Sequence, residues 1–213
     1  MRRKTRTATM FLNYGPLPES LKLSGEDASG WRHMKEPKPD GFALYSAAVS
    51  AALAVLWWTC WSALVPELKI RTELTSLFFS WTFAATVVAV IVVHEVIHLV
   101  FHPHFGASKQ SVVGFWPKHL LFYAQYFGVM SRNRYVAILL APFALLSVMP
   151  LLAHFVIPMN AHVAIISFVN ALFAAGDILG ACILILRVPP EADVVHSGWH
   201  TLWRTRQPSV ALR

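Results

Sequence analysis

The sequence predicts an all-α membrane protein with about four transmembrane helices and a hairpin-like interfacial connection between the second and third. The first observation is composition. The 213 residues are 56% hydrophobic and only 14% charged, with a mean hydropathy of +0.51, which is too apolar for a soluble domain of this length. The second is charge distribution, because residues 41–66 and 74–94 contain no charged side chain, and residues 135–186 contain only Asp177.

Four stretches are long enough to span a bilayer, whose hydrocarbon core takes roughly 20 mostly apolar residues in a helix. In chain order they are residues 42–65, 77–101, 135–157 and 161–187. The segment before them is polar and rich in Pro and Gly, without sustained periodicity, and we assign it no chemistry.

The connection between the second and third spans is too long for a simple turn and is rich in aromatic residues. Residues 110–116 and 121–127 are β-branched or aromatic runs separated by Pro117 and Lys118, which favours a hairpin. An exposed edge of such a hairpin could pair with an extended peptide. An amphipathic interfacial helix starting at Lys118 is an equally compatible interpretation.

The second span contains the sequence His94-Glu95-Val96-Ile97-His98, a match to the H-E-x-x-H metal motif. Histidines four residues apart project from one face of a helix, so both imidazoles can bind a single zinc ion. Glu95, one position further along, can reach a water activated by the metal without being a ligand. A carboxylate inside an apolar span costs about 2–3 kcal/mol or more to insert, which favours a functional role.

A catalytic zinc site needs three protein ligands and an open position, so a third ligand must exist. His104 fits a tri-histidine zincin pattern only in part, because that pattern also expects Gly where Phe101 stands. His102 lies one turn beyond His98, but Pro103 disfavours helical geometry there. Asp177 is the remaining candidate and lies at a matching depth in the last span, so we predict His94, His98 and Asp177 as ligands.

Asn170 lies seven residues before Asp177 and therefore on roughly the same helical face. Its amide could bind a substrate strand or help stabilise an oxyanion. It could equally bond a neighbouring helix, and the sequence does not separate these roles.

These residues resemble two known groups of proteins. Site-2 type intramembrane zinc proteases carry His-Glu-x-x-His in one transmembrane helix and an Asp ligand in a later one, although they usually have prolines between the Asn and the Asp, where this chain has none. A closer resemblance is to a family of small bacterial membrane proteins described as putative zincin peptidases. The resemblance covers roughly residues 42–195. With the charge distribution described below, we expect three parts: a cytoplasmic N-terminal segment (1–41), a membrane-embedded zincin-like domain (42–195) and a cytoplasmic C-terminal tail (196–213).

The expected function is that of an intramembrane zinc metalloprotease with Zn²⁺ as cofactor and Glu95 as general base, acting on membrane-associated polypeptides. The net charge of +7 comes from residues flanking the spans and forms no nucleic-acid-binding motif, so we expect the lipid bilayer, and no nucleic acid, as a partner. One alternative is a haem-binding electron-transfer protein using histidines on different spans. Its candidates are His94, His98, His154 and His162. Another is a non-catalytic protein that binds or transports metal.

The distribution of Lys and Arg predicts the topology. Sixteen lie in the two terminal segments and the middle connection, and two lie in the first loop, at Lys69 and Arg71. Because positive charges stay inside, we expect an integral protein of the bacterial inner membrane with both termini in the cytoplasm. A cysteine placed at Arg6 or Arg206 should therefore react with a membrane-impermeant thiol reagent only after the inner membrane is opened. Labelling of either position in intact spheroplasts would reverse the topology.

Overall fold

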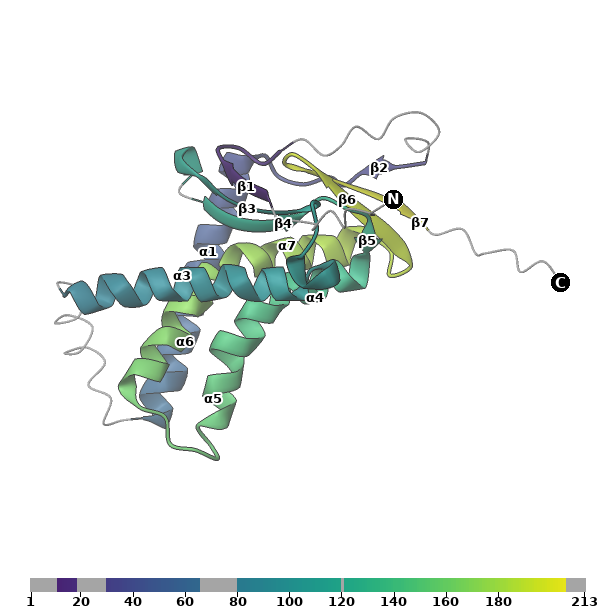
Figure 1. Ribbon diagram of the computed structural model, residues 1–213. Helices are drawn as coiled ribbons and strands as arrows, with labels where there is room; N and C mark the ends of the chain where they lie inside the picture. The colour runs from purple at the N-terminus through teal and green to yellow at the C-terminus, as the bar shows by residue number, and fades with distance from the viewer. Residues whose placement is uncertain (1–10, 19–29, 66–79, 120, 206–213) are drawn as a thin grey trace, which may run out of the picture. The chain divides into compact units, whose positions relative to one another are not determined.

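The computed structural model of the chain describes residues 11–18, 30–65, 80–119 and 121–205 (Figure 1). Within them, two β-sheets accompany the helices, so the predicted all-α fold class is wrong and the protein is a mixed α/β protein. Hydropathy identifies long apolar segments well. It says little about short strands in polar connections, whose pairing partners are distant in the sequence.

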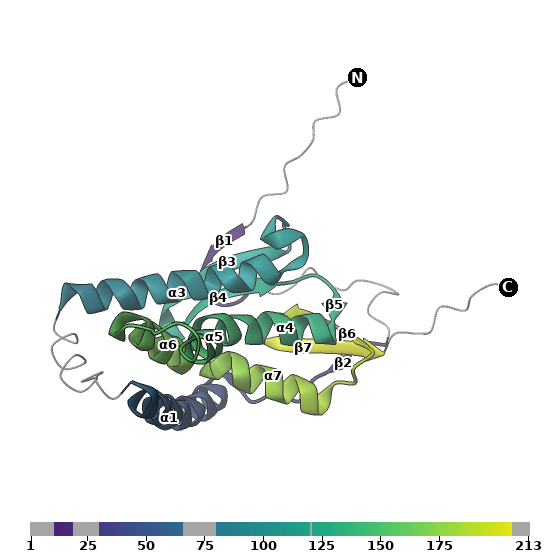
Figure 2. The same cartoon turned by 90° about the horizontal axis from the view of Figure 1, so that it is seen from below.

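The chain divides into two compact units, and the helical unit comprises the described parts of residues 37–98 and 138–182. Its elements are α1 (Pro39–Leu64), most of α3 (Trp81–Phe101), the end of α4 (Arg132–Phe143), the π-helical turn η4 (Ala144–Val148), α5 (Met149–Ala153), α6 (Ala161–Phe173) and the start of α7 (Ala175–Arg187). Helix α6 lies between α1 and α3 (Figure 2).

Both contacts of α6 contain an apolar cluster. Trp57 and Trp61 of α1 pack with Ala164 and Ala171 of α6, where the small alanine side chains make room for the indole rings. On another face of α6, Ile165 and Val169 pack with Val90 of α3. The central position of α6 brings its polar residues close to both neighbouring helices.

Three helices are long and apolar enough to cross a membrane: α1, α3 and the continuous run Arg132–Ala153. Helices α6 and α7 pass the same test together but are bent by 48° at their break, so the number of candidate spans is three, or up to four. The prediction of one continuous span over residues 161–187 missed this break, because no proline marks it. The predicted loop at residues 66–75 and the start of the second predicted span lie outside the described residues.

The sheet unit comprises the described parts of residues 1–36, 99–137 and 183–213. Its first sheet has the order β1 (Phe11–Tyr14), β3 (Ser111–Trp116), β4 (Leu121–Tyr126). Strands β3 and β4 pair antiparallel, with Ser111 opposite Tyr126, which confirms the hairpin and excludes the helix alternative. Strand β1 pairs parallel to β3 on its other side, so β3 is central and only β1 or β4 could offer an edge to a peptide.

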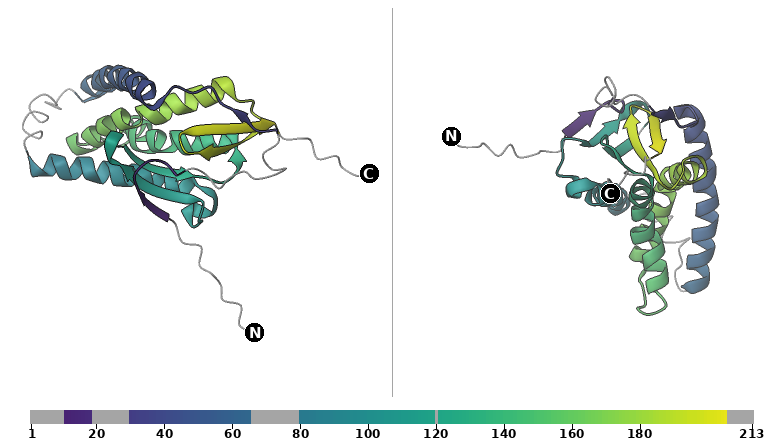
Figure 3. Two further views of the ribbon diagram at one scale, coloured as in Figure 1. Left: turned by 90° about the horizontal axis from the view of Figure 1, so that it is seen from above. Right: turned by 90° about the vertical axis from the view of Figure 1, so that its right-hand side faces the viewer.

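The second sheet has the order β2 (Arg32–His33), β7 (His200–Thr205), β6 (Ala192–Ser197), β5 (Met130–Ser131), with antiparallel pairing throughout (Figure 3). Strands β6 and β7 form a hairpin with a two-residue turn, in which Gly198 adopts a φ of 56° that other residues rarely adopt.

The predicted division of the chain at residues 41 and 195 stays a prediction, and the segments outside residues 42–195 contain strands. Residues assigned to the C-terminal tail form β7 and the end of β6, and the N-terminal segment supplies β1 and β2. The signal for the C-terminal hairpin was in the sequence, since Val194 and Val195 precede Gly198, and Leu202 and Trp203 follow it.

A chain of polar contacts joins the second sheet to the segment after β2. The Thr201 backbone N–H donates to Glu36 Oε1 at 2.7 Å, and the Thr201 hydroxyl donates to Glu36 Oε2 at 3.3 Å. His196 Nδ1 lies 3.3 Å from the same hydroxyl, and the His196 ring contacts Tyr135 edge-on at 4.4 Å between centroids. Burial, and secondarily repulsion from His102, lowers the pKa of His196 to about 3.

The low pKa of His196 predicts a pH dependence of stability. An exposed histidine in the unfolded chain has a pKa of about 6.5, so between that pH and about pH 3 the unfolded state binds a proton that the folded state does not. The free energy of unfolding should therefore fall as the pH is lowered, by up to about 1.4 kcal/mol per pH unit from this residue. Thermal unfolding in detergent should show a shallower pH dependence for His196→Gln than for the wild type. The exposed His104→Gln serves as control, and equal slopes for the wild type and His196→Gln would contradict the assignment.

Candidate metal centre

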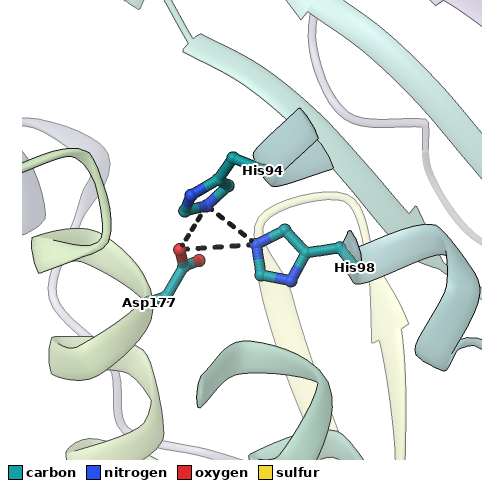
Figure 4. Close-up of side chains that lie close together, drawn as sticks. All are labelled: His94, His98 and Asp177. Atoms are coloured by element: carbon teal, nitrogen blue, oxygen red, sulfur yellow. Dashed lines mark hydrogen bonds and ion pairs between the residues drawn. The ribbon is translucent and has the colours of Figure 1, made fainter. Parts of the chain in front are cut away.

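Two histidines of α3 and one aspartate of α7 point at one another in the helical unit (Figure 4). His94 and His98 lie one turn apart on the same face, and both are buried. Asp177 lies in the first turn of α7, where the unpaired N–H groups of a helix start favour a negative charge. His94 Nε2 lies 2.9 Å from Asp177 Oδ2, and His98 Nε2 lies 3.4 Å from it.

The donor set fits zinc in both spacing and chemistry. The two Nε2 atoms of His94 and His98 are 3.1 Å apart, which completes a triangle with edges of 2.9, 3.1 and 3.4 Å. In tetrahedral zinc coordination with bonds of about 2.0–2.1 Å, neighbouring ligand atoms are separated by roughly 3.3 Å. Two imidazoles and a carboxylate leave the fourth position for a water or a substrate atom, as catalytic zinc sites require.

The tautomer of His98 follows from its other ring nitrogen. Nδ1 lies 2.8 Å from the backbone carbonyl of Ile138, which can only accept, so Nδ1 carries the proton. This carbonyl is available because Pro142, four residues later in α4, has no N–H to donate back to it. In the neutral ring, the Nε2 atom of His98 therefore carries the lone pair, on the side of Asp177.

The same reasoning applies to His94. Its Nδ1 lies 2.9 Å from Asn170 Oδ1, while the Nδ2 group of Asn170 donates to the Pro142 carbonyl at 3.1 Å and to Ser147 Oγ at 2.8 Å. A backbone carbonyl cannot donate, so the amide orientation of Asn170 is fixed and His94 Nδ1 must carry the proton. In the neutral ring, the Nε2 lone pair of His94 likewise faces the centre of the triangle.

When both imidazoles are neutral, three electron-pair acceptors therefore meet within 3.4 Å of one another, beside two buried histidines. Such an arrangement is repulsive unless a proton or a metal cation lies between the acceptors, and a divalent metal ion satisfies all three at once. Each histidine also donates its other N–H to an oxygen, the arrangement that orients histidine ligands in metal sites.

The other sequence candidates lie outside this group. Glu95 is half-buried on α3, next to His94, and is not one of the three converging residues. His102 is buried with its Nδ1 3.3 Å from Ser111 Oγ, and His104 is exposed in the turn η2 (Pro103–Gly106) with a φ of 57°. As expected from Pro103, neither belongs to the cluster of potential ligands.

The geometry disfavours the haem alternative. A haem iron with two histidine ligands lies between them, on opposite faces of the ring system, and Nε2 atoms 3.1 Å apart leave no room for it. His154 Nδ1 accepts from the Met159 N–H at 3.2 Å, and His162 is exposed on α6. Neither approaches the cluster of potential ligands.

Asn170 is fully buried, and its oxygen and both its N–H groups are hydrogen-bonded within the helical unit. The sequence left two roles open for Asn170. These hydrogen bonds match the role of a contact with neighbouring helices, and none of them supports a contact with substrate or an oxyanion. Sequence reasoning missed Pro142, Ser147 and the Ile138 carbonyl. A proline inside an apolar span was the available signal, because it leaves the carbonyl four residues earlier unpaired.

Comparison with known proteins gives one match. Residues 87–192 match the model of a family described as putative zincin peptidase, a range that contains all three converging residues and Glu95. Zincins bind zinc, so the match implies a zinc cofactor. No curated protein and no solved structure is significantly similar to the chain.

Removal of any one ligand should empty the site. His94→Ala, His98→Ala and Asp177→Ala each delete one of three donors, so each purified variant should lose most of its zinc as measured by mass spectrometry of the metal content. His104→Ala is the matched control and should keep near-stoichiometric zinc, because that side chain is exposed and outside the cluster. Zinc retained by Asp177→Ala but lost by His104→Ala would identify a tri-histidine site instead.

Proposed function

Because the chain belongs, through residues 87–192, to the family described as putative zincin peptidases, we propose that it is a zinc metallopeptidase that works within the membrane on membrane-associated polypeptides. The observation that carries this proposal is the convergence of three acceptor atoms from His94, His98 and Asp177, with each histidine held in the tautomer that a metal requires.

The surfaces of the helices support a membrane location. Helix α3 buries His94 and His98 and exposes valines, the reverse of a helix at the surface of a soluble protein. The exposed valines of α3 are Val88, Val92, Val93, Val96 and Val100. Helix α1 likewise exposes Leu44, Val55 and Leu56. Lipid is the environment in which such faces are stable.

The chemistry assigned to the site is hydrolysis of a peptide bond. A bound zinc ion supplies a Lewis acid, which polarises the scissile carbonyl and makes a water acidic enough to attack near neutral pH. Glu95 accepts the proton of the attacking water and passes it to the leaving amine. His94, His98 and Asp177 would hold the metal, and the burial of the two histidines would limit the access of bulk water.

The proposal extends to the substrate and to the topology of the chain in the membrane. A polypeptide in an intact helix has its carbonyls hydrogen-bonded, so the substrate must be locally unwound before cleavage. The Lys and Arg distribution supports an inner-membrane protein with cytoplasmic termini, and ligands near the cytoplasmic ends of their spans favour substrate entry from that side.

Replacement of Glu95 by Gln should separate metal binding from chemistry. Gln has a similar size but cannot accept a proton, so Glu95→Gln should keep its zinc while cleaving about 10²–10⁴-fold more slowly. The assay uses purified full-length protein reconstituted in liposomes with a fluorescently labelled single-span model polypeptide, and zinc content is measured on the same samples. Wild-type protein that binds zinc but cleaves neither this polypeptide nor labelled casein would count against peptidase activity. Undiminished cleavage by Glu95→Gln would remove Glu95 from the mechanism.

A further inference from the structure

A chain of buried hydrogen bonds behind His94 begins at two tryptophans of α1. The indole N–H of Trp57 lies 3.0 Å from Ser167 Oγ, and that of Trp61 lies 3.3 Å from the same atom. An indole nitrogen can only donate, so both bonds have one possible direction. Both rings and Ser167 are buried.

Two serines connect these donors to Asn170 through reciprocal bonds to each other's backbone carbonyls. Ser167 Oγ accepts twice from the indoles and donates its single proton to the Ser147 carbonyl at 3.0 Å, which uses its full capacity. Ser147 Oγ donates in return to the Ser167 carbonyl at 2.9 Å. With that proton committed, Ser147 Oγ can only accept from Asn170, whose Nδ2 lies 2.8 Å away.

A backbone irregularity provides the second anchor of Asn170. The π-helical turn η4 shifts the hydrogen-bond register, with the Met149 N–H bonding to the Ala144 carbonyl five residues earlier. The Pro142 carbonyl just before this turn accepts the other N–H of Asn170. Asn170 therefore presents its oxygen to His94 Nδ1 and cannot reverse without placing that oxygen against two acceptors.

We propose that Trp57, Trp61, Ser167, Ser147 and Asn170 are positioning residues that hold His94 in the tautomer with a free Nε2 lone pair. Helix α1, which contributes no residue to the ligand cluster, thereby sets the metal affinity of a site built by α3 and α7. The inference rests on the proposed metal site. It differs from a packing role because it depends on the indole N–H and the hydroxyl groups, and not on the volume of the side chains.

The test compares variants that remove the hydrogen-bonding groups of this chain one step at a time. Trp57→Phe with Trp61→Phe removes both indole donors, Ser147→Ala removes the relay hydroxyl, and Asn170→Leu removes the partner of His94. The full-length chain in detergent is titrated with zinc against a chromophoric chelator. The Asn170→Leu variant should bind zinc about 10–100-fold more weakly, the usual loss when the partner of a ligand histidine is deleted. The tryptophan double variant and Ser147→Ala should show smaller losses in the same direction.

Three controls separate positioning from folding. Trp58 lies on the same helix, but the residue is 36% exposed and is not one of the two donors to Ser167. The Trp58→Phe variant should therefore match the wild type. Ser147→Thr keeps the hydroxyl and should restore the affinity lost by Ser147→Ala. Thermal unfolding in detergent reports whether each variant is folded. If the tryptophan double variant does not fold, the comparison of Ser147→Ala with Ser147→Thr still tests the proposal.

A second measurement does not require zinc. Nitrogen NMR of metal-free protein labelled at histidine distinguishes the two tautomers, and the His94 signal is identified by its loss in His94→Ala. We expect the Nδ1–H form in the wild type and a mixture in Asn170→Leu and Ser147→Ala. Wild-type zinc affinity and an unchanged tautomer in folded Ser147→Ala would overturn the positioning role and leave the zinc site standing. A wild-type protein that binds no zinc but shows these tautomer changes would overturn the proposed function alone.

Discussion

The helical unit is organised around the meeting of two imidazoles and one carboxylate. His94 Nε2, His98 Nε2 and Asp177 Oδ2 lie 2.9 to 3.4 Å apart, and neutral rings protonated at Nδ1 direct both Nε2 lone pairs toward the carboxylate. These groups attract a cation, because a proton or a metal ion between them removes the repulsion that the lone pairs would otherwise cause. Within this unit, α3 and α7 supply these three groups, while α4 and α6 supply the hydrogen-bond partners of the two histidines.

The supporting hydrogen bonds come from places where helices depart from regular geometry. Pro142 leaves the Ile138 carbonyl for His98, and the Pro142 carbonyl, next to the π-helical turn, accepts from Asn170. Carbonyls inside a regular helix are already paired and offer little to a side chain. A break between α6 and α7 similarly places Asp177 in a first helical turn. Irregularities that lower helix stability locally are therefore the features that make a polar site possible in an apolar bundle.

Tryptophan has two functions in α1. Trp57 and Trp61 fill the space against the small residues Ala164 and Ala171 of α6, and their N–H groups satisfy Ser167. A buried polar chain is stable only when each member is paired, and here every group from the indoles to His94 has a partner. The same two tryptophans therefore provide both the apolar packing and the hydrogen-bond donors between α1 and α6.

The sequence by itself determined the apolar segments, the pairing of His94 with His98 and the choice of Asp177, because these depend on composition and on spacing along single helices. It also favoured the β3–β4 hairpin, a local structure. Tertiary structure decided the two sheets, since β1 and β2 pair with strands far along the chain, which no local pattern encodes. It also decided the role of Asn170, because hydrogen-bond direction depends on Pro142 and Ser147, residues more than 20 positions away. Helical periodicity can place a ligand on a face, but only packing between helices can fix which ring nitrogen faces the metal.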